Sequence, residues 1–125
     1  MPTIIRKSES HLLETRRETH ISTTWHVRSN VWRPATDVYE TETGVVVRVE
    51  IAGLREEDIE VVIQGELLLI SGNRSDLPER RAYHQMEIPF GRFTVSVVMP
   101  ASIVIEGAFT DYQDGFLTIH FPKDK

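Results

Sequence analysis

The sequence of 125 residues is long enough for one domain with one core. It contains no cysteine, which excludes disulfides and thiolate chemistry, and no segment approaches the roughly 18 consecutive apolar residues of a membrane span. A formal net charge of -5, from 14 Lys and Arg against 19 Asp and Glu, argues against binding to a phosphate backbone. These features predict a soluble cytoplasmic protein with no nucleic-acid or membrane partner.

Residues 1–33 are predicted to form an N-terminal arm, because they sustain no strand alternation. Charged residues dominate positions 8–20, where Leu12 and Leu13 alone are apolar, so an isolated helix there would be marginal. The second half of the arm gathers apolar and aromatic side chains, namely Ile21, Trp25, Val27, Val31 and Trp32. Two interpretations stay open: the tryptophans dock on their own domain as core, or they contact other protein chains, where large aromatics carry much of the burial energy.

The domain proper is predicted over residues 34–123 and begins with strands of clear alternation. Pro34 suits the start of an edge strand, and residues 35–40 follow it. Apolar residues then alternate over residues 45–51 and again over 59–63, separated by Gly53 and an acidic turn. Residues 64–66 can reverse the chain into a short apolar run, residues 67–70, which is expected to end at Ser71-Gly72-Asn73.

The second half of the domain repeats this pattern after a long polar segment. Residues 73–86 are charged and contain Pro78, and a loop this long in a compact domain needs a reason. Alternation resumes over residues 93–99, and Asp114-Gly115 is a hairpin signal before a last strand, residues 116–121, which Pro122 ends. We therefore predict an all-β fold: an immunoglobulin-like antiparallel β-sandwich of seven to eight strands, with residues 124–125 as a residual tail.

The sequence gives little support for a catalytic or metal-binding site. The histidines at 11, 20, 26, 84 and 120 lack paired ligand spacing, and His120 is expected to be a solvated side chain. There is no nucleophile-elbow motif and no glycine-rich phosphate loop, and the carboxylates of Glu56, Glu57 and Asp58 fall on an exposed turn. We predict no catalytic residue, no metal site and no cofactor, and hence no enzyme.

Three segments together resemble the alpha-crystallin domain of small heat-shock proteins. The first contains Ala52-Gly53-Leu54, an acidic turn ending in Asp58-Ile59, and Leu69-x-Ser71-Gly72. The second runs from Phe90-Gly91-Arg92-Phe93 to Met99-Pro100, and the third is Tyr112-Gln113-Asp114-Gly115-Phe116-Leu117-Thr118-Ile119. They stand in the family's order and near its spacing, and the resemblance covers residues 35–123.

The resemblance implies a groove between two strands that accepts an extended segment of a client or of a neighbouring subunit. The residues expected to line it are Ile59, Val61, Val62, Ile63, Ala108, Thr110 and Tyr112. Val62 lies on the face opposite Ile59, Val61 and Ile63, and it is either part of this groove or an ordinary surface valine.

The resemblance also gives the long loop a role. In bacterial and plant members, its short strand pairs with the first domain strand of a partner subunit, which implies a homodimer and, built from it, a larger homo-oligomer. The exchanged strand would include Arg80, Arg81, Ala82, Tyr83 and His84, and the acceptor strand Ala35, Asp37, Val38 and Tyr39.

The sequence departs from the family in its ends and at three motif positions. The chain stops at Phe121-Pro122-Lys123-Asp124-Lys125, without the Ile-x-Ile/Val tail that fills the groove of a neighbouring dimer, so we expect no tail-linked assembly. Ile4 and Ile5 are not expected to stand in for it, because they are adjacent and Arg6 takes the second apolar position. Family Ala, Asn and Arg positions align with Thr110, Asp114 and Val95.

Three functions follow from these features. The favoured one is an ATP-independent chaperone, a holdase, that binds partly unfolded client proteins through the arm and the groove. The alternative is a binding module like the CS domain, a monomeric sandwich that docks on a folded partner chaperone. A purely structural assembly protein would oligomerise without binding clients.

Overall fold

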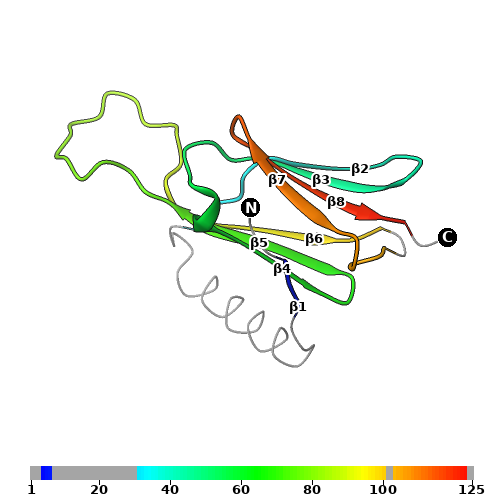
Figure 1. Cartoon of the computed structure of the whole chain (residues 1–125). Helices are drawn as coiled ribbons and strands as arrows, with labels where there is room; N and C mark the ends of the chain where they lie inside the picture. The colour runs from blue at the N-terminus through cyan, green and yellow to red at the C-terminus, as the bar shows by residue number, and fades with distance from the viewer. Residues whose placement is uncertain (1–3, 7–30, 101–102, 124–125) are drawn as a thin grey trace.

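The computed structural model describes residues 4–6, 31–100 and 103–123, and these residues form two packed sheets (Figure 1). Sheet A has the strand order β1-β4-β5-β6, and sheet B has the order β2-β3-β8-β7. The strands are β1 (Ile4–Arg6), β2 (Thr36–Glu40), β3 (Gly44–Glu50), β4 (Ile59–Gln64), β5 (Leu67–Arg74), β6 (Gly91–Val98), β7 (Phe109–Gln113) and β8 (Phe116–Pro122). The prediction of an all-β sandwich of seven to eight strands is confirmed.

Neighbouring strands pair antiparallel with one exception. The hairpins β2–β3, β4–β5 and β7–β8 and the pairs β3–β8 and β5–β6 are antiparallel, whereas β1 runs parallel to β4. The Asp114-Gly115 turn between β7 and β8 has positive φ at both residues, 54° and 84°, as a tight hairpin of this kind requires. The acidic stretch before β4 forms a single 3-10 turn, η1 (Glu56–Asp58).

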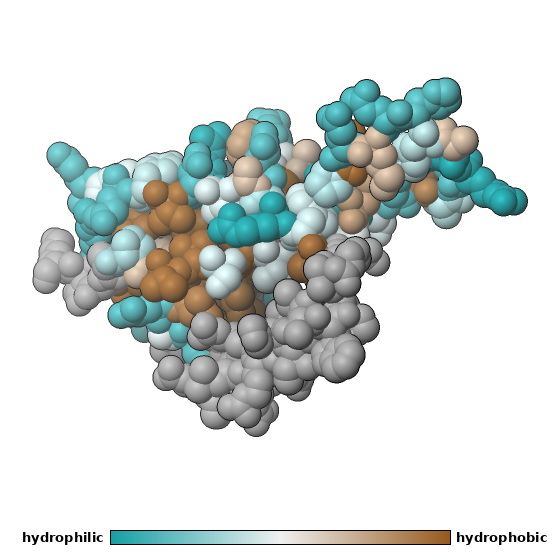
Figure 2. Space-filling view, turned by 180° about the vertical axis from the view of Figure 1, so that it is seen from behind, coloured by the Kyte–Doolittle hydropathy of each residue, from teal (hydrophilic) through white to brown (hydrophobic). Residues whose placement is uncertain are grey.

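The long segment between β5 and β6 projects away from the sandwich (Figures 1 and 2). Every residue from 75 to 89 is exposed, and none of them belongs to a strand. The predicted exchange strand at residues 80–85 is therefore absent from the single chain. Within the described residues, no helix is long and apolar enough to cross a membrane.

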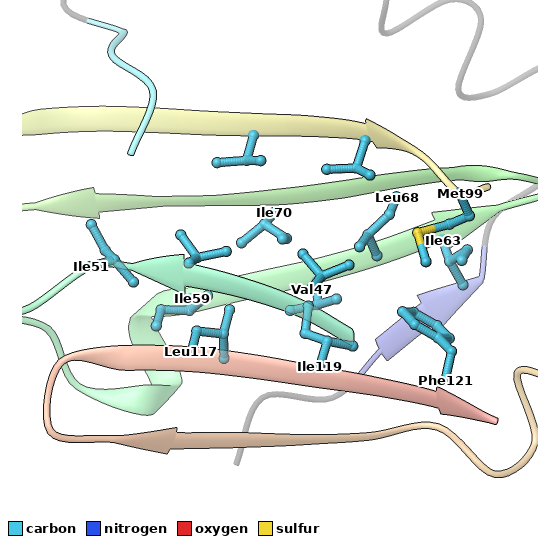
Figure 3. Close-up of a cluster of buried hydrophobic side chains, with 14 of the residues drawn as sticks. Val47, Ile51, Ile59, Ile63, Leu68, Ile70, Met99, Leu117, Ile119 and Phe121 are labelled. Atoms are coloured by element: carbon cyan, nitrogen blue, oxygen red, sulfur yellow. The ribbon is translucent and has the colours of Figure 1, made fainter. Parts of the chain in front are cut away.

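The core fills the space between the two sheets (Figure 3). Inward positions alternate along each strand as the sequence predicts, and they are almost fully buried: Val45, Val47, Val49, Ile51, Ile59, Val61, Ile63, Leu68, Ile70, Phe93, Val95, Val97, Met99, Leu117, Ile119 and Phe121. Residues from both sheets point toward one another in this layer, for example Ile70 of β5 and Leu117 of β8. Apolar residues thus alternate in the sequence because each strand buries one of its two faces.

Strand β5 is longer than predicted, and Gly72 explains why. The sequence suggested a turn at Ser71-Gly72-Asn73, but β5 continues through them to Arg74. A Cβ atom on Gly72 would lie 2.6 Å from the Asp58 carbonyl oxygen and 2.7 Å from the Phe93 ring. The glycine is therefore required by close packing inside a strand, and it does not end the strand.

Candidate binding surfaces

The chain's own N-terminal segment lies on the edge of β4. Strand β1 pairs with it in parallel register, with Ile4 opposite Val61 and Arg6 opposite Ile63. Ile4 is partly buried and packs against the core. This pairing within one chain was not predicted from the sequence, and the expectation that Ile4 and Ile5 do not stand in for the tail between subunits stays a prediction.

The other side chains predicted to line the groove are mostly buried. Ile59, Val61 and Ile63 face the core and are at most 5% exposed, and Thr110 of β7 is 2% exposed. Val62 points to the opposite face of sheet A, yet it is only 5% exposed, so it is not an ordinary surface valine. Whether these residues bind a client or a tail remains a prediction.

Tyr112, the last predicted groove residue on β7, holds the connection that follows β3. Its hydroxyl donates to the Ile51 carbonyl oxygen at 2.7 Å and accepts from the Leu54 backbone N–H at 3.4 Å. Ala108 and Tyr112 both pack, partly buried, against the core. Neighbouring Phe109 is 53% exposed and stacks on His120, with ring centroids 4.4 Å apart. His120 is thus a half-buried stacking partner, which differs from the solvated side chain expected.

The face of β7 and β8 also has a shallow cavity. It has a volume of about 280 Å³ and is lined by Thr41, Thr43, Gly44, Val45, Val46, Phe109, His120, Phe121 and Pro122. Val46 of β3 is 6% exposed because it lies in register between Tyr39 and His120. The lining offers one imidazole and two hydroxyl groups.

The projecting loop carries exposed apolar side chains and an ion-pair cluster. Leu77, Tyr83, Met86 and Ile88 are 50–67% exposed. Arg81 donates to the Asp76 carboxylate at 2.8 Å, to the Glu79 carboxylate at 2.9 Å and to the Tyr83 hydroxyl at 2.8 Å. The cluster gives the loop a defined shape although it lies away from the core.

Charge and hydrogen bonding shift two pKa values within this loop. The Leu77 backbone N–H, followed by the hydrogen bond and charge of Arg81, lowers the pKa of Asp76 below its ordinary value of 3.8. Hydrogen bonds to Asp76, Tyr83 and Glu79 raise the pKa of Arg81 above its ordinary range. Both groups are therefore charged at neutral pH.

Arg74 fixes the base of the loop, a role that the sequence analysis missed. Its guanidinium donates to the Pro89 carbonyl at the end of the loop and to the Ala52 carbonyl after β3. The same group lies 4.5 Å from the Trp32 ring centroid and 5.2 Å from that of Phe90. No sequence signal singled it out, because an arginine after Gly72-Asn73 is indistinguishable from ordinary surface charge.

The arm residues divide between described and undescribed parts of the chain. Ile21, Trp25 and Val27 lie outside the described residues, and Val31 is 50% exposed. Trp32 pairs with Phe93 in an isolated parallel β-bridge, and the Trp32 Nε1 donates to the Gly91 carbonyl at 3.2 Å. The centroids of the Trp32 and Phe93 rings lie 5.7 Å apart. Of the two interpretations, docking on its own domain therefore applies to Trp32.

Strand β2, the predicted acceptor of an exchanged strand, lies at the edge of sheet B. Ala35 and Asp37 are exposed, Val38 is 41% exposed and Tyr39 is 44% exposed. On the loop, Arg80, Ala82 and His84 are exposed as well. The two predicted partners of a strand exchange are thus both accessible, but within one chain they do not pair with each other.

The described residues contain no group of three or more His, Cys, Asp or Glu side chains that could hold a metal ion. For binding, these surfaces instead provide the backbone of edge strands and exposed apolar side chains.

The comparisons with known proteins decide the family. The model of the Hsp20/alpha crystallin family matches residues 37–125, most of the sandwich and more than half of the chain. The chain belongs to this family. The resemblance noted from three sequence segments is confirmed by this match.

Relatives of this small heat-shock protein include two from Rickettsia felis. Small heat shock protein C4 is 29% identical over 100 residues, which cover 78% of this chain and 61% of the relative. Small heat shock protein C2 is 33% identical over 92 residues, which cover 72% of this chain and 60% of the relative. The chain thus spans about three fifths of the length of these relatives.

Solved structures of the family share the fold. Heat shock protein 16.0 from Schizosaccharomyces pombe has a TM-score of 0.68 and 28% identity, over 75% of this chain and 89% of that chain. The hspA protein from Xanthomonas axonopodis has a TM-score of 0.68 and 26% identity, over 74% of this chain and 94% of that chain. These likenesses place the alpha-crystallin β-sandwich in this chain.

Proposed function

We propose that this small heat-shock protein is an ATP-independent holdase that binds partly unfolded proteins and keeps them from aggregating. The observation that carries the proposal is the set of apolar side chains exposed on a sandwich of this family: Val38, Tyr39, Leu77, Tyr83, Met86, Ile88, Val98 and Phe109. Such side chains bury apolar area on contact with an unfolded client, which requires no reactive group.

A homodimer formed by strand exchange would leave Val98 and Phe109 exposed on each copy, so that both copies present apolar side chains to a client. The loop over residues 75–90 projects from the sandwich, and the β2 edge is accessible, so a second copy can supply the loop to β2. The exchange would cover Val38 and Tyr39 and give a partner to the exposed apolar side chains of the loop. Many weak contacts on one particle raise the effective affinity for a client.

The projecting loop speaks against one of the two alternatives. A CS-domain-like module that docks on a folded chaperone would be a monomer and would need no reaching loop. A purely structural assembly protein would form the dimer and ignore clients. The docking module therefore leaves the loop unexplained, and only client binding separates the assembly protein from a holdase.

Heat aggregation of a model enzyme tests the holdase function. A stoichiometric amount of this protein is expected to suppress light scattering, and serum albumin at equal mass is the control for nonspecific protection. Scattering equal to that of the albumin control would contradict the function. The molar mass measured on the same sample distinguishes a monomeric docking module from a dimer.

A further inference from the structure

One guanidinium group fixes the base of the projecting loop (Figure 1). Arg74 is the last residue of β5 and pairs with Gly91, the first residue of β6, so these two residues stand at the ends of the loop. The Arg74 Nε donates to the Pro89 carbonyl at 3.1 Å, and its Nη1 donates to the Ala52 carbonyl at 3.2 Å. The end of the loop is thereby joined to the connection between β3 and β4.

The same guanidinium group contacts the residue that leads into β2. The Arg74 Cζ atom lies 4.5 Å from the Trp32 ring centroid and 5.2 Å from that of Phe90, so the cation contacts one ring before β2 and one ring in the loop. Trp32 is itself fixed on β6, because its N–H donates to the Arg92 carbonyl and its carbonyl accepts from the Thr94 N–H, each at 3.0 Å. Strand β2 begins shortly after Trp32 along the chain.

Reciprocal strand exchange depends on the direction of the loop relative to β2 of the same chain. In a closed pair, each copy donates its loop and also accepts the loop of the other copy on its own β2. After the first exchange, the second one forms readily only if the remaining loop already points toward the other copy, which gives it a high effective concentration. A loop that turns freely about its base would instead reach a third copy and leave the assembly open.

Given the strand exchange of the proposed function, we propose that Arg74 is a positioning residue that sets the direction of the donated loop relative to the entry of β2 and so favours closed pairs. Arginine suits this place because its planar group donates to two carbonyls and stacks on aromatic rings at the same time. The compact ammonium group of lysine keeps the charge without this fork of donors.

Substitutions of Arg74 in the full chain test this role. Arg74→Gln removes the cation, and Arg74→Lys keeps the charge without the fork. Arg55→Gln is the matched control, because it makes the same change at a side chain that is 77% exposed on the acidic turn. Sedimentation over a range of protein concentrations measures the dissociation constant of the dimer and the mass distribution, and circular dichroism at the same temperature confirms that each variant is folded.

We expect Arg74→Gln to raise the dissociation constant of the dimer by about tenfold and to produce species heavier than the dimer, because the loop loses its preorganised direction. Arg74→Lys should raise this constant by about threefold. Arg55→Gln should change it by less than about twofold, since an exposed charge contributes little. A dissociation constant for Arg74→Gln equal to that of Arg55→Gln would overturn the proposal.

Energy transfer within one chain reports the direction of the loop directly. The chain has no cysteine, so His84→Cys provides a single thiol for a dye, and Trp25→Phe leaves Trp32 as the one tryptophan donor. Time-resolved fluorescence below the dissociation constant gives the distribution of distances from Trp32 to the dye. Arg74→Gln should broaden this distribution. A role in packing alone would lower the free energy of unfolding and leave the distribution unchanged, which would overturn the proposal.

The mass of the unsubstituted chain separates the role of Arg74 from the exchange beneath it. If this chain is a monomer at every concentration, strand exchange is wrong, and the role of Arg74 in it is wrong as well. If it is a dimer and Arg74→Gln behaves like Arg55→Gln, only the role of Arg74 is wrong. Suppression of aggregation by the unsubstituted chain tests the holdase function independently of both results.

Discussion

Tyr112 joins β7 to the connection after β3 through one hydroxyl group, although the sequence indicated only an aromatic residue at a groove. The hydroxyl donates to Ile51 and accepts from Leu54, so it ties β7 to the connection between β3 and β4 at one end of the sandwich. A tyrosine at this position therefore contributes a specific hydrogen bond in addition to packing.

Removal of that hydroxyl should lower stability. Tyr112→Phe is expected to reduce the free energy of unfolding by about 1 kcal/mol, because the partly buried Ile51 carbonyl loses its donor. Urea denaturation at fixed protein concentration measures the change. Tyr39→Phe, at a residue 44% exposed, is the matched control and should change stability by less than about 0.5 kcal/mol.

Gln64 at the end of β4 gives the opposite prediction. It is 7% exposed, and neither its Nε2 nor its Oε1 has a hydrogen-bond partner in the described structure. Gln64→Leu should raise the free energy of unfolding by about 1 kcal/mol, because leucine removes an unsatisfied buried amide. A loss of stability in urea denaturation would contradict this, and Gln113→Leu, at an exposed glutamine, serves as the control.

At the scale of elements, alternation could predict the core strands because each buries one face. It could not predict β1, since three residues carry no period and the pairing with β4 is long-range in sequence. Gly72 resembled a turn residue, and only the Phe93 ring beside it reveals that it lies within a strand. Gln64 also resembled a turn residue, because it directly precedes Gly65. In the structure it is buried and is the last residue of β4.

The projecting loop should hold its shape by charge, and this depends on pH. The folded-state pKa of Asp76 is lowered, so the cluster with Arg81 is complete above pH 3.8 and is lost as the pH falls through the lowered pKa. NMR should show the Asp76 carboxyl titrating below 3.8, with the Arg81 Nη–H resonances, whose protons are donated to Asp76, shifting at the same midpoint. In Asp76→Asn the Nη–H shift at that midpoint should vanish. If the Asp76→Asn variant kept a shift at the same pH, the pairing would be contradicted.

At the scale of the whole molecule, association should depend on the β2 edge. Val38→Lys places a charge where an exchanged strand would add, and it should shift the molar mass from dimer toward monomer. Val98→Lys is the matched control, because Val98 is 69% exposed on sheet A, away from this edge, and should leave the mass unchanged. A dimeric mass for Val38→Lys would contradict exchange through β2.

The two sheets end differently, and this difference would decide how many copies an assembly of the chain could join. Sheet A is extended at β4 by β1 and bridged at β6 by Trp32, whereas β2 and β7 are the last strands of sheet B among the described residues. Contacts through β2 alone would be isologous and close after two copies. Contacts that join β2 of one copy to β7 of the next would be head-to-tail and would build rings or filaments, so participation of β7 separates a pair from a polymer.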